Sequence, residues 1–213
     1  MPQLDESDVQ AAYSRIKALV LETPVFSSQA LNQLLGCEVI FKGEHLQRGG
    51  AFKARGAINM VYAQPLSELA SGVCTHSSGN HGAALARAAR ARGVAAHIVM
   101  PKNASPAKRR LVGHFGGHLI ECDNSLEARE KALRALAART GALYVPPFDA
   151  PLIIAGQGTA LLEFKRQTPE PDVVVVHVGG RGFIAGRCLV PDRPVVQVNE
   201  AEAARDRATS PAG

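Results

Sequence analysis

The segment at residues 172–178, Asp-Val-Val-Val-Val-His-Val, constrains the fold more than any other part of the chain. A strand that is apolar on both faces needs neighbouring strands at both edges and helices over both faces, as in the centre of a parallel sheet. Further candidate strands occupy residues 38–42, 71–75, 95–100, 118–121, 143–145 and 194–198. Strands that alternate with helical segments in this way are typical of α/β architecture, with parallel sheets in three layers.

The segments between these strands show helical spacing of apolar residues and recognisable capping residues. Ser27 or Ser28 can cap one short helix that stops at Gly36, and Pro106 follows Ser105 at the start of another. We expect helices over residues 5–20, 28–36, 55–63, 80–93, 106–116, 125–141 and 151–167. These helices supply the layers that a buried parallel sheet requires.

The chain is mildly basic, with 24 Lys and Arg residues against 19 Asp and Glu residues and a net charge of +5. The densest basic cluster, Lys108-Arg109-Arg110, has no interleaved aromatic residues, which argues against a nucleic-acid-binding face. A phosphorylated or carboxylated small ligand fits the same charge bias. No apolar run approaches the roughly 18 residues that span a bilayer, so no membrane partner is expected.

The cysteines do not indicate a metal site. None of them forms a C-x-x-C pair, so neither a zinc site nor a redox motif is predicted. Free cysteines without a secretory signal fit a reducing compartment, and we expect a cytoplasmic protein. The four residues are Cys37, Cys74, Cys122 and Cys188.

Lys53 lies between Phe52 and a glycine-flanked turn, at the point where a helical apolar pattern begins. Most lysines are solvated surface residues, and Lys53 taken alone would be assigned to that class. A lysine amine becomes reactive when it is partly desolvated and loses its proton near neutral pH, and it can then form a Schiff base with a carbonyl cofactor. Two further loops favour this second interpretation.

The loops at residues 77–82, Ser-Ser-Gly-Asn-His-Gly, and 179–183, Gly-Gly-Arg-Gly-Phe, each follow a candidate strand and open a helix. Small residues at a helix start expose backbone N–H groups, and the helix dipole adds partial positive charge, which suits a carboxylate or a phosphate. An ordinary capping turn explains the first loop equally well when it is taken alone. Loops that follow the strands of open α/β sheets converge at one edge, so we expect them to form one site with Lys53.

A nicotinamide-cofactor fold is a rival interpretation of the loop at residues 179–183. Gly180, Gly182 and Gly186 resemble a loose dinucleotide fingerprint, and Glu200 ends the following strand. The crossover helix would have to fit within residues 183–190, whereas a crossover usually needs about a dozen residues or more. This spacing disfavours the nicotinamide interpretation.

Four motifs occur in order along the chain. They are Gly-Ala-Phe-Lys-Ala-Arg-Gly-Ala at residues 50–57, the loop at residues 77–82, Ala-Gly-Gln-Gly-Thr at residues 155–159, and Val-Gly-Gly-x-Gly-x-Ile-Ala-Gly at residues 178–186. Together they resemble the fold-type-II pyridoxal-phosphate enzymes, in particular the serine/threonine dehydratase and serine racemase group. The resemblance implies a tryptophan-synthase-beta-like fold, pyridoxal 5'-phosphate as the cofactor and a small, serine- or threonine-like amino acid as the substrate.

The resemblance also implies roles for individual residues. Lys53 would carry the cofactor as a Schiff base and then act as the base at the substrate Cα, and Phe52 would pack beside the cofactor. Asn80 would hydrogen-bond the ring oxygen of the cofactor, and in a racemase Ser78 would serve as the acid/base on the opposite face. The substrate carboxylate would be held by Ser77, Ser78, Gly79 and His81, through backbone and hydroxyl donors. The cofactor phosphate would be bound by Gly179, Gly180, Arg181, Gly182 and Phe183.

Two features depart from the family pattern. Arg181 stands where the family has a glycine, so its side chain either strains and crowds the phosphate loop or pairs with the phosphate. The chain also ends early, which predicts an incomplete larger domain at residues 1–71 and 150–213 and an intact smaller domain at residues 72–149. Because apolar surface and a strand edge would stay exposed, we expect a marginally stable chain that aggregates or pairs with another chain and has little or no dehydratase activity.

The favoured function is that of a pyridoxal-phosphate-dependent threonine/serine dehydratase, an ammonia-lyase that converts a β-hydroxy amino acid to a 2-oxo acid and ammonia. A serine or aspartate racemase and a hydroxyaspartate lyase are alternatives on the same scaffold, and Ser78 permits both. A non-catalytic remnant that pairs with a full-length relative is an alternative of another class. The early end of the chain favours it, and the retention of Lys53, Ser78 and Asn80 favours an enzyme. The plainest alternative is a soluble α/β domain without a cofactor.

Overall fold

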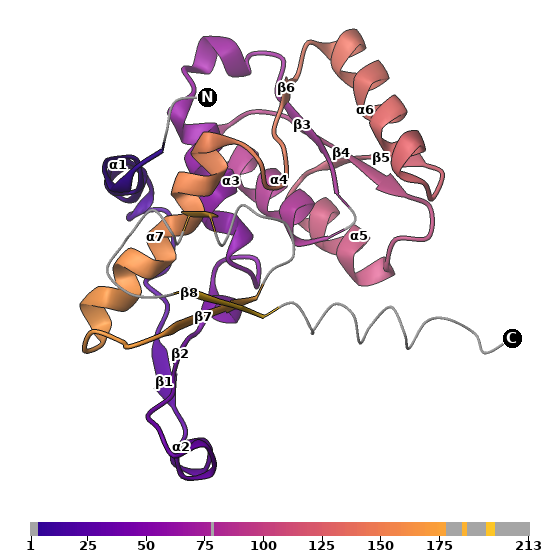
Figure 1. Cartoon of the computed structure of the whole chain (residues 1–213). Coiled ribbons are helices and arrows are strands. Elements are labelled where there is room, and N and C mark those ends of the chain that lie inside the picture. Colours follow the sequence, from indigo (N-terminus) through magenta and orange to yellow (C-terminus); the bar gives the residue numbers. More distant parts are fainter. Residues whose placement is uncertain (1–3, 78, 178–184, 187–194, 199–213) are drawn as a thin grey trace, which may run out of the picture.

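A parallel four-stranded sheet, in the order β5-β4-β3-β6, organises the computed structural model, which describes residues 4–77, 79–177, 185–186 and 195–198. Its strands are β3 (Val73–His76), β4 (Ala96–Pro101), β5 (His118–Cys122) and β6 (Leu143–Tyr144). Parallel strands bring the loops that follow them to one edge of the sheet. The loops after β3, β4 and β6 therefore open at the same edge (Figure 1).

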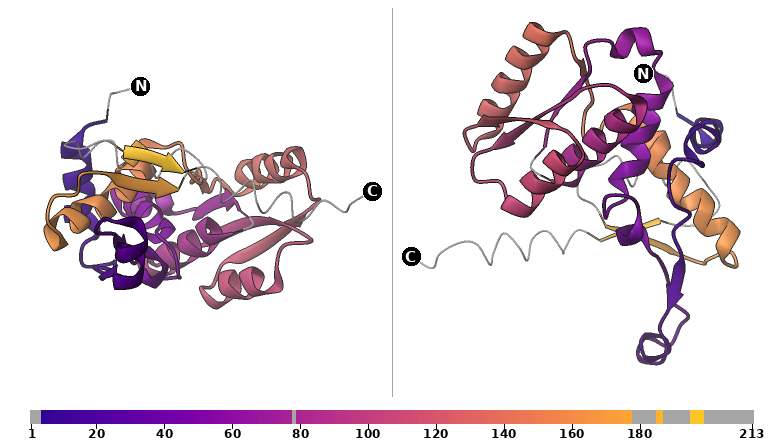
Figure 2. Two further views of the ribbon diagram at one scale, coloured as in Figure 1. Left: turned by 60° about the horizontal axis from the view of Figure 1, so that its bottom comes forward. Right: turned by 180° about the vertical axis from the view of Figure 1, so that it is seen from behind.

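Helices cover both faces of this sheet, as the strand pattern predicts (Figures 1 and 2). On one face, α4 (Asn80–Arg92) packs against β3 and β4, and α5 (Pro106–His114) packs against β5. On the other face, α6 (Leu126–Thr140) packs against β3 and β4. Successive side chains of a strand point to opposite faces, so Ile98 joins the core beneath α4 whereas Val99 joins Leu133 of α6.

Three helices from the segments on either side of the four-stranded sheet in the sequence form a second packed unit. α7 (Pro151–Gln167) packs against α1 (Glu6–Ile16) and against α3 (Lys53–Ala63), which in turn packs against α4. The contact between α3 and α7 is unusually close, because a Cβ atom added to Gly156 would lie only 2.7 Å from the Cα atom of Gly56. Side chains would prevent this approach, so the glycines of two sequence motifs serve packing here.

A parallel strand pair and an antiparallel arm complete the described structure. β7 (Val174–His177) pairs in parallel with β8 (Val195–Val198). The arm consists of β1 (Val25–Ser27) and β2 (Ile40–Lys42) with α2 (Gln29–Leu35) between them, and α2 lies at its tip (Figure 1). The sequence did not predict β1, and α2 buries none of its residues. Two short 3-10 helices, η1 (Glu44–Leu46) and η2 (Leu66–Leu69), flank α3.

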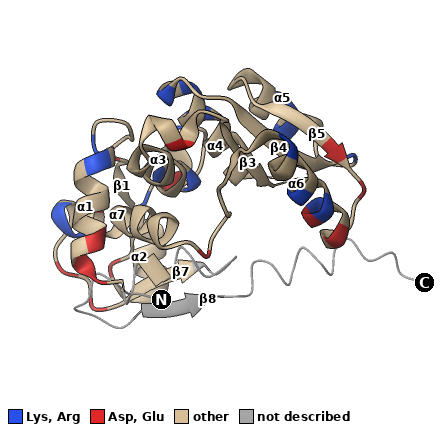
Figure 3. Ribbon diagram, turned by 90° about the horizontal axis from the view of Figure 1, so that it is seen from above, with Lys and Arg blue, Asp and Glu red and all other residues tan. Residues whose placement is uncertain are grey.

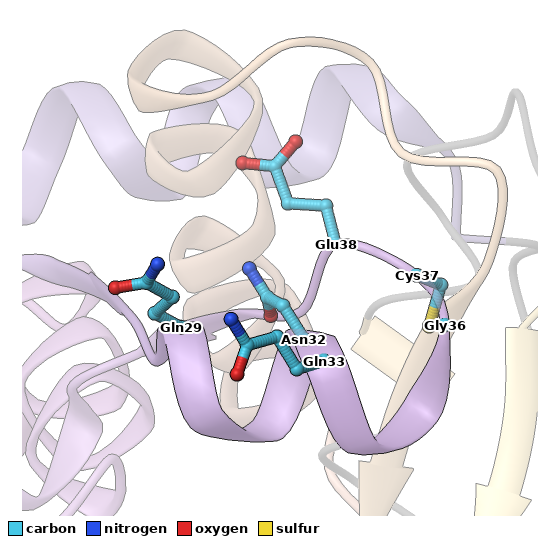
Figure 4. A pocket seen from close by; sticks show the side chains of 6 residues that line it. All are labelled: Gln29, Asn32, Gln33, Gly36, Cys37 and Glu38. Carbon is cyan, nitrogen blue, oxygen red and sulfur yellow. The ribbon is translucent and has the colours of Figure 1, made fainter.

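An open groove of about 450 Å³ runs along α2 (Figure 4). It is lined by Gln29, Asn32, Gln33, Gly36, Cys37 and Glu38. Three of these side chains are amides, and Asn32 Oδ1 accepts a hydrogen bond from the backbone N–H of Val39. None of these residues belongs to the three loops that the sequence singles out, so the candidate site lies elsewhere.

The α/β class and the parallel sheet agree with the sequence predictions, and α7 spans the predicted residues 151–167. β7, predicted to be buried on both faces at the centre of a parallel sheet, pairs within the described residues with β8 alone and leaves Val175 64 % exposed. α3 begins at Lys53, two residues before the predicted start, which places Lys53 in the first turn of the helix. All strands of the four-stranded sheet fall within residues 72–149, but the division into two domains stays a prediction. Within the described residues, no helix is both long and apolar enough to cross a membrane.

Candidate active site

The turn before Lys53 is shaped by two consecutive glycines. Gly49 and Gly50 have φ angles of 80° and 78°, a region that residues with side chains rarely adopt. The start of the turn is fixed by Gln47, which is 2 % exposed and exchanges two hydrogen bonds with the backbone of Leu21. The N–H of Gly50 then bonds the carbonyl of Gln47 at 2.7 Å. This turn delivers Lys53 to the start of α3 in one orientation.

The amine of Lys53 is partly withdrawn from water. Its Nζ atom donates a hydrogen bond to the carbonyl oxygen of Pro147 at 2.7 Å and lies 5.2 Å from the ring centre of Phe52. Burial lowers the pKa of Lys53 to about 8, against an opposing effect of the nearby Asp149 carboxylate. At pH 7 about a tenth of the amine is therefore neutral, far more than for a solvated lysine. Lys53 thus has the desolvated amine that Schiff-base chemistry requires.

The loop after β3 leads directly into α4, as predicted. The N–H of Gly79 bonds the hydroxyl oxygen of the half-buried Ser77 at 3.2 Å, and Asn80 is exposed at the first position of the helix. Among the described residues no side chain caps the first turn of α4, so its N–H groups have the partial positive charge that attracts an anion. Ser78 lies outside the described residues, and so do the predicted phosphate-binding residues Gly179, Gly180, Arg181, Gly182 and Phe183.

His81 is buried at 3 % exposure in the first turn of α4. Its Nε2 atom lies 3.2 Å from the carbonyl oxygen of Val145, which can only accept, so Nε2 carries the proton. Burial lowers the pKa of His81 to about 4, the bond to Val145 opposes this effect, and the charge of Lys53 lowers it further. The neutral ring therefore presents Nδ1 as an acceptor. Within the described residues Nδ1 is buried and has no hydrogen-bond partner, so it is able to accept a hydrogen bond from a ligand or water.

The connection from β6 to α7 was missed by the sequence predictions, although it contacts both candidate side chains, Lys53 and His81. Its carbonyl groups at Val145 and Pro147 bond His81 and Lys53, respectively. The segment contains two successive prolines, which have no N–H groups, and it follows a strand whose end lies at the same edge as the Ser77 loop. That position at the carboxyl edge is the signal that could have identified it.

Beneath the lysine turn lies a buried cluster of charges, centred on the fully buried Arg55. The guanidinium donates two hydrogen bonds to Glu44, both at 2.8 Å, and two to Glu163, both at 2.7 Å. A further donation reaches the hydroxyl of Thr159 at 3.3 Å. Burial alone would raise the pKa of Glu44, but the bonds and charge of Arg55 outweigh it and lower that pKa. Arg55 thereby connects α3 to η1 and α7.

Lys42 completes this cluster. Its Nζ atom donates to Glu163 at 2.9 Å, to the carbonyl of Thr23 at 2.6 Å and to Gln167 at 2.8 Å. Burial lowers the pKa of Lys42, and the hydrogen bond and charge of Glu163 oppose that shift. The two cations and two carboxylates of the cluster, Lys42, Arg55, Glu44 and Glu163, balance in charge.

Comparison with known proteins identifies the family. Residues 16–191 match the family described as "Pyridoxal-phosphate dependent enzyme". The chain belongs to this family. Members of the family depend on pyridoxal phosphate, and the nicotinamide interpretation is thereby set aside. The family assignment agrees with the four ordered motifs, and the role of Lys53 as the residue that would hold the aldehyde of the cofactor stays a prediction.

Relatives of this pyridoxal-phosphate family member include two kinds of enzyme. The chain is 43 % identical over 182 residues to the β-hydroxyaspartate dehydratase of Paracoccus denitrificans, covering 85 % of this chain and 58 % of the relative. It is 42 % identical over 200 residues to a serine racemase of Oryza sativa, covering 93 % and 59 %. The structure of maize serine racemase superposes with a TM-score of 0.90 at 38 % identity, covering 94 % of this chain and 65 % of that one. The chain thus spans about three fifths of the length of these relatives.

The described residues fit the cofactor in part of the site. A desolvated amine at Lys53 suits bond formation with an aldehyde, and the half-buried Phe52 lies close to that amine. The unpartnered Nδ1 atom of His81 and the uncapped first turn of α4 leave polar groups for a bound molecule to satisfy. The exposed Asn80 stays a predicted partner of the cofactor ring.

Proposed function

We propose that the chain is a pyridoxal-phosphate-dependent ammonia-lyase that acts on small β-hydroxy amino acids of the serine, threonine or hydroxyaspartate type. The observation that carries this proposal is the amine of Lys53, whose pKa is lowered to about 8 beside the neutral His81. Both side chains are fixed by carbonyls of one connection, so their spacing is set by a single segment. The named relatives support the serine and hydroxyaspartate types and do not single out threonine.

When bound, the cofactor supplies an aldehyde that joins the substrate amine and a ring that stores electrons when Cα loses its proton. The uncapped N–H groups of α4 hold the substrate carboxylate, with the hydroxyl of Ser77 beside them. The amine of Lys53, neutral in an appreciable fraction of molecules at pH 7, takes the Cα proton at Nζ. His81 accepts a hydrogen bond at Nδ1 from a substrate hydroxyl or from water. Loss of the β-hydroxyl and hydrolysis then give a 2-oxo acid and ammonia.

A racemase is a second candidate, favoured by the likeness to the rice and maize serine racemases. Racemisation needs a proton donor on the face of Cα opposite Lys53, and Ser78 is the predicted donor. The dehydratase and the racemase share every described group discussed above, so they differ only in what happens after the proton leaves Cα. Product analysis therefore decides between them.

The test of the proposed function is to load the purified chain with pyridoxal phosphate, reduce it with borohydride and map the modified lysine. We expect an absorbance band of a Schiff base and an adduct on Lys53, both lost in Lys53→Ala. Lys102→Ala, at an exposed lysine, is a matched control that should retain the adduct. An adduct on Lys42 or Lys102 in the wild type would refute the assignment. Assays of 2-oxo acid release and of D-serine formation then separate lyase, racemase and non-catalytic remnant.

A further inference from the structure

Thr75 is a fully buried residue of β3 whose hydroxyl has no role in the proposed reaction. It pairs in register with Ile98 of β4, and Ile98 belongs to the core beneath α4, so the side chain of Thr75 points to the α4 face as well. Its Oγ1 atom has no hydrogen-bond partner within the described residues. A buried hydroxyl without a partner destabilises a fold, so a partner is expected.

The ring of His81 lies over Thr75. The turn that carries His81 rests on β4, because a Cβ atom added to Gly82 would lie 2.9 Å from Cγ2 of Ile98. The ring reaches from there to the carbonyl of Val145. Val145 directly follows β6 and lies level with Thr75, because the preceding residues of the two segments pair in register. Since β3 lies between β4 and β6 in the sheet, the ring crosses β3 on the face to which Thr75 points.

The two unpartnered groups complement each other chemically. Nδ1 of His81 is a buried acceptor, whereas the hydroxyl of Thr75 can both donate and accept. No direct hydrogen bond joins the two atoms, since each is without a partner in the part of the chain that the structure describes. Two buried polar groups that face each other without a direct bond are typically joined by an internal water.

The charges around the ring favour a neutral bridging molecule. Neither β3 nor α4 contains an acidic residue (Figure 3). Burial lowers the pKa of His81, the bond to Val145 opposes this effect, and Lys53 and His76 lower the pKa further, so the surroundings of the ring disfavour a second cation. An unprotonated anion has no proton to donate to Nδ1, whereas water both donates and accepts. These requirements together select water.

Resting on the proposed function, we propose that Thr75 is a positioning residue whose hydroxyl holds an internal water, and that this water donates a hydrogen bond to Nδ1 of His81. The water and the carbonyl of Val145 then fix the ring at both of its nitrogens. The first turn of α4, which holds the substrate carboxylate in the proposed function, is thereby held over the end of β3. Nδ1 is assigned to water and not to a substrate hydroxyl.

The test follows the ring of His81 by NMR in the cofactor-free chain. In the wild type we expect the ring proton between the two nitrogens to show a cross-relaxation signal with a long-lived water. Thr75→Val keeps the shape of the side chain and removes the hydroxyl, so it should lose this signal and shift the Nδ1 resonance toward that of a nitrogen without a hydrogen bond. Thr75→Ser keeps the hydroxyl and should retain both features.

Carboxylate affinity reports the positioning role. Butyrate, a simple carboxylate, should bind Thr75→Val about fivefold more weakly than wild type, the size of one neutral hydrogen bond, and should bind Thr75→Ser like wild type. Thr159→Val is the matched control, because Thr159 is equally buried and its hydroxyl bonds the carbonyl of Gly156 in its own helix. This control should leave the signals of His81 and the butyrate affinity unchanged.

The inference is overturned if the wild type shows no water signal at His81, if Thr75→Val keeps that signal, or if Thr75→Val binds butyrate as wild type does. The first of these results needs no variant, so it decides the matter even where Thr75→Val does not fold. Urea denaturation adds a sign: Thr75→Val should be less stable than wild type, whereas loss of a hydroxyl that is merely unpaired would make it more stable. The cofactor adduct on Lys53 is measured separately, so the proposed function can survive the failure of this inference.

Discussion

Two buried polar regions lie two residues apart along α3 and differ in how their groups are satisfied. Around Arg55, all five N–H groups of the guanidinium reach acceptors and the charges of the four ionised side chains cancel. Around Lys53, the amine has a lowered pKa and the neighbouring His81 keeps a buried acceptor without a partner. The first region is complete by itself, whereas the second leaves the Nδ1 atom of His81 for a ligand or water to satisfy.

Within one turn of α3, the region around Arg55 should therefore contribute to stability, and the region around Lys53 should contribute to ligand binding. A satisfied ionic cluster is destabilising to disrupt, because removal of one member leaves the others buried and unpaired. A desolvated site with unsatisfied polar groups destabilises the fold in the absence of its ligand. Substitution of its side chains should therefore destabilise the fold only slightly or even stabilise it. Substitutions in the two regions should therefore have opposite effects on stability.

The largest effect is expected for Arg55→Met. Loss of the guanidinium leaves Glu44 and Glu163 with only Lys42 and Thr23 as partners in a dry environment. We expect the free energy of unfolding to fall by about 3–5 kcal/mol, measured by urea denaturation. Arg134→Met is the control, since its pair with Glu130 is exposed and of the i,i+4 type, and should cost at most about 0.5 kcal/mol. A loss below about 1 kcal/mol in Arg55→Met would contradict the comparison.

Lowering the pH should reduce the free energy of unfolding, because His81 becomes protonated more readily in the unfolded chain than in the folded one. Its folded pKa is about 4 and its ordinary value is 6.5, so the unfolded chain binds the proton first as the pH falls. The stabilising contribution is present above pH 6.5 and disappears between pH 6.5 and 4, by about 3 kcal/mol in total. Unfolding at pH 7 and pH 4.5 measures the loss in wild type. His81→Asn should show a smaller pH dependence, and identical slopes in the two proteins would exclude this role of His81.

Lys53→Met should stabilise the chain while abolishing the cofactor adduct. Below pH 8 the folded chain holds a charged amine that burial disfavours, and this cost fades as the pH rises from 8 to 10.5. We expect a gain of about 1 kcal/mol at pH 7 that shrinks above pH 8, measured by thermal unfolding across that range. The exposed Lys102→Met should show no such gain. If Lys53→Met instead destabilises the chain at pH 7, Lys53 contributes to stability in the same manner as Arg55.

The smallest effect is expected for Ser77→Ala. The hydroxyl of Ser77 accepts a single 3.2 Å bond from the N–H of Gly79 in a half-buried loop. We expect a loss of about 0.5 kcal/mol in unfolding free energy, near the lower limit for one hydrogen bond. Carboxylate binding should weaken more than stability does, as judged by titration with butyrate. An unchanged butyrate affinity would remove Ser77 from the carboxylate site.

Local chemistry made much of the fold predictable from the sequence. Ser28 and Gly36 cap α2, Ser125 and Gly141 cap α6, and Pro106 begins α5, each as expected. β1 escaped prediction because it is only three residues long and is defined by pairing with β2, not by a pattern of its own. α3 was predicted to start at Arg55, because the turn formed by the preceding glycines is not visible in helical spacing.

The chemistry of the site was less predictable than its residue list. Lys53 and His81 were identified by resemblance, but their carbonyl partners lie 94 and 64 residues away and depend on tertiary structure. The burial of Arg55 contradicts the usual exposure of arginine, and only the convergence of Glu44 and Glu163 explains it. His81 was expected to hold the carboxylate through its backbone, which stays a prediction, and the sequence did not indicate that its neutral ring leaves Nδ1 as a buried acceptor.

The contact between Gly56 and Gly156 has a consequence for the length of the chain. Each residue of a helix turns by about 100°, so an insertion or deletion between Asp149 and Gly156 would bring Ala155 or Gln157 to face Gly56. The Cβ atom of either residue would lie about 2.7 Å from the Cα atom of Gly56, a distance that packed atoms do not tolerate. Connections usually accept changes in length more readily than changes in shape. Here we expect the number of residues from Pro147 to Gly156 to be the same in related chains, even where the side chains between them differ.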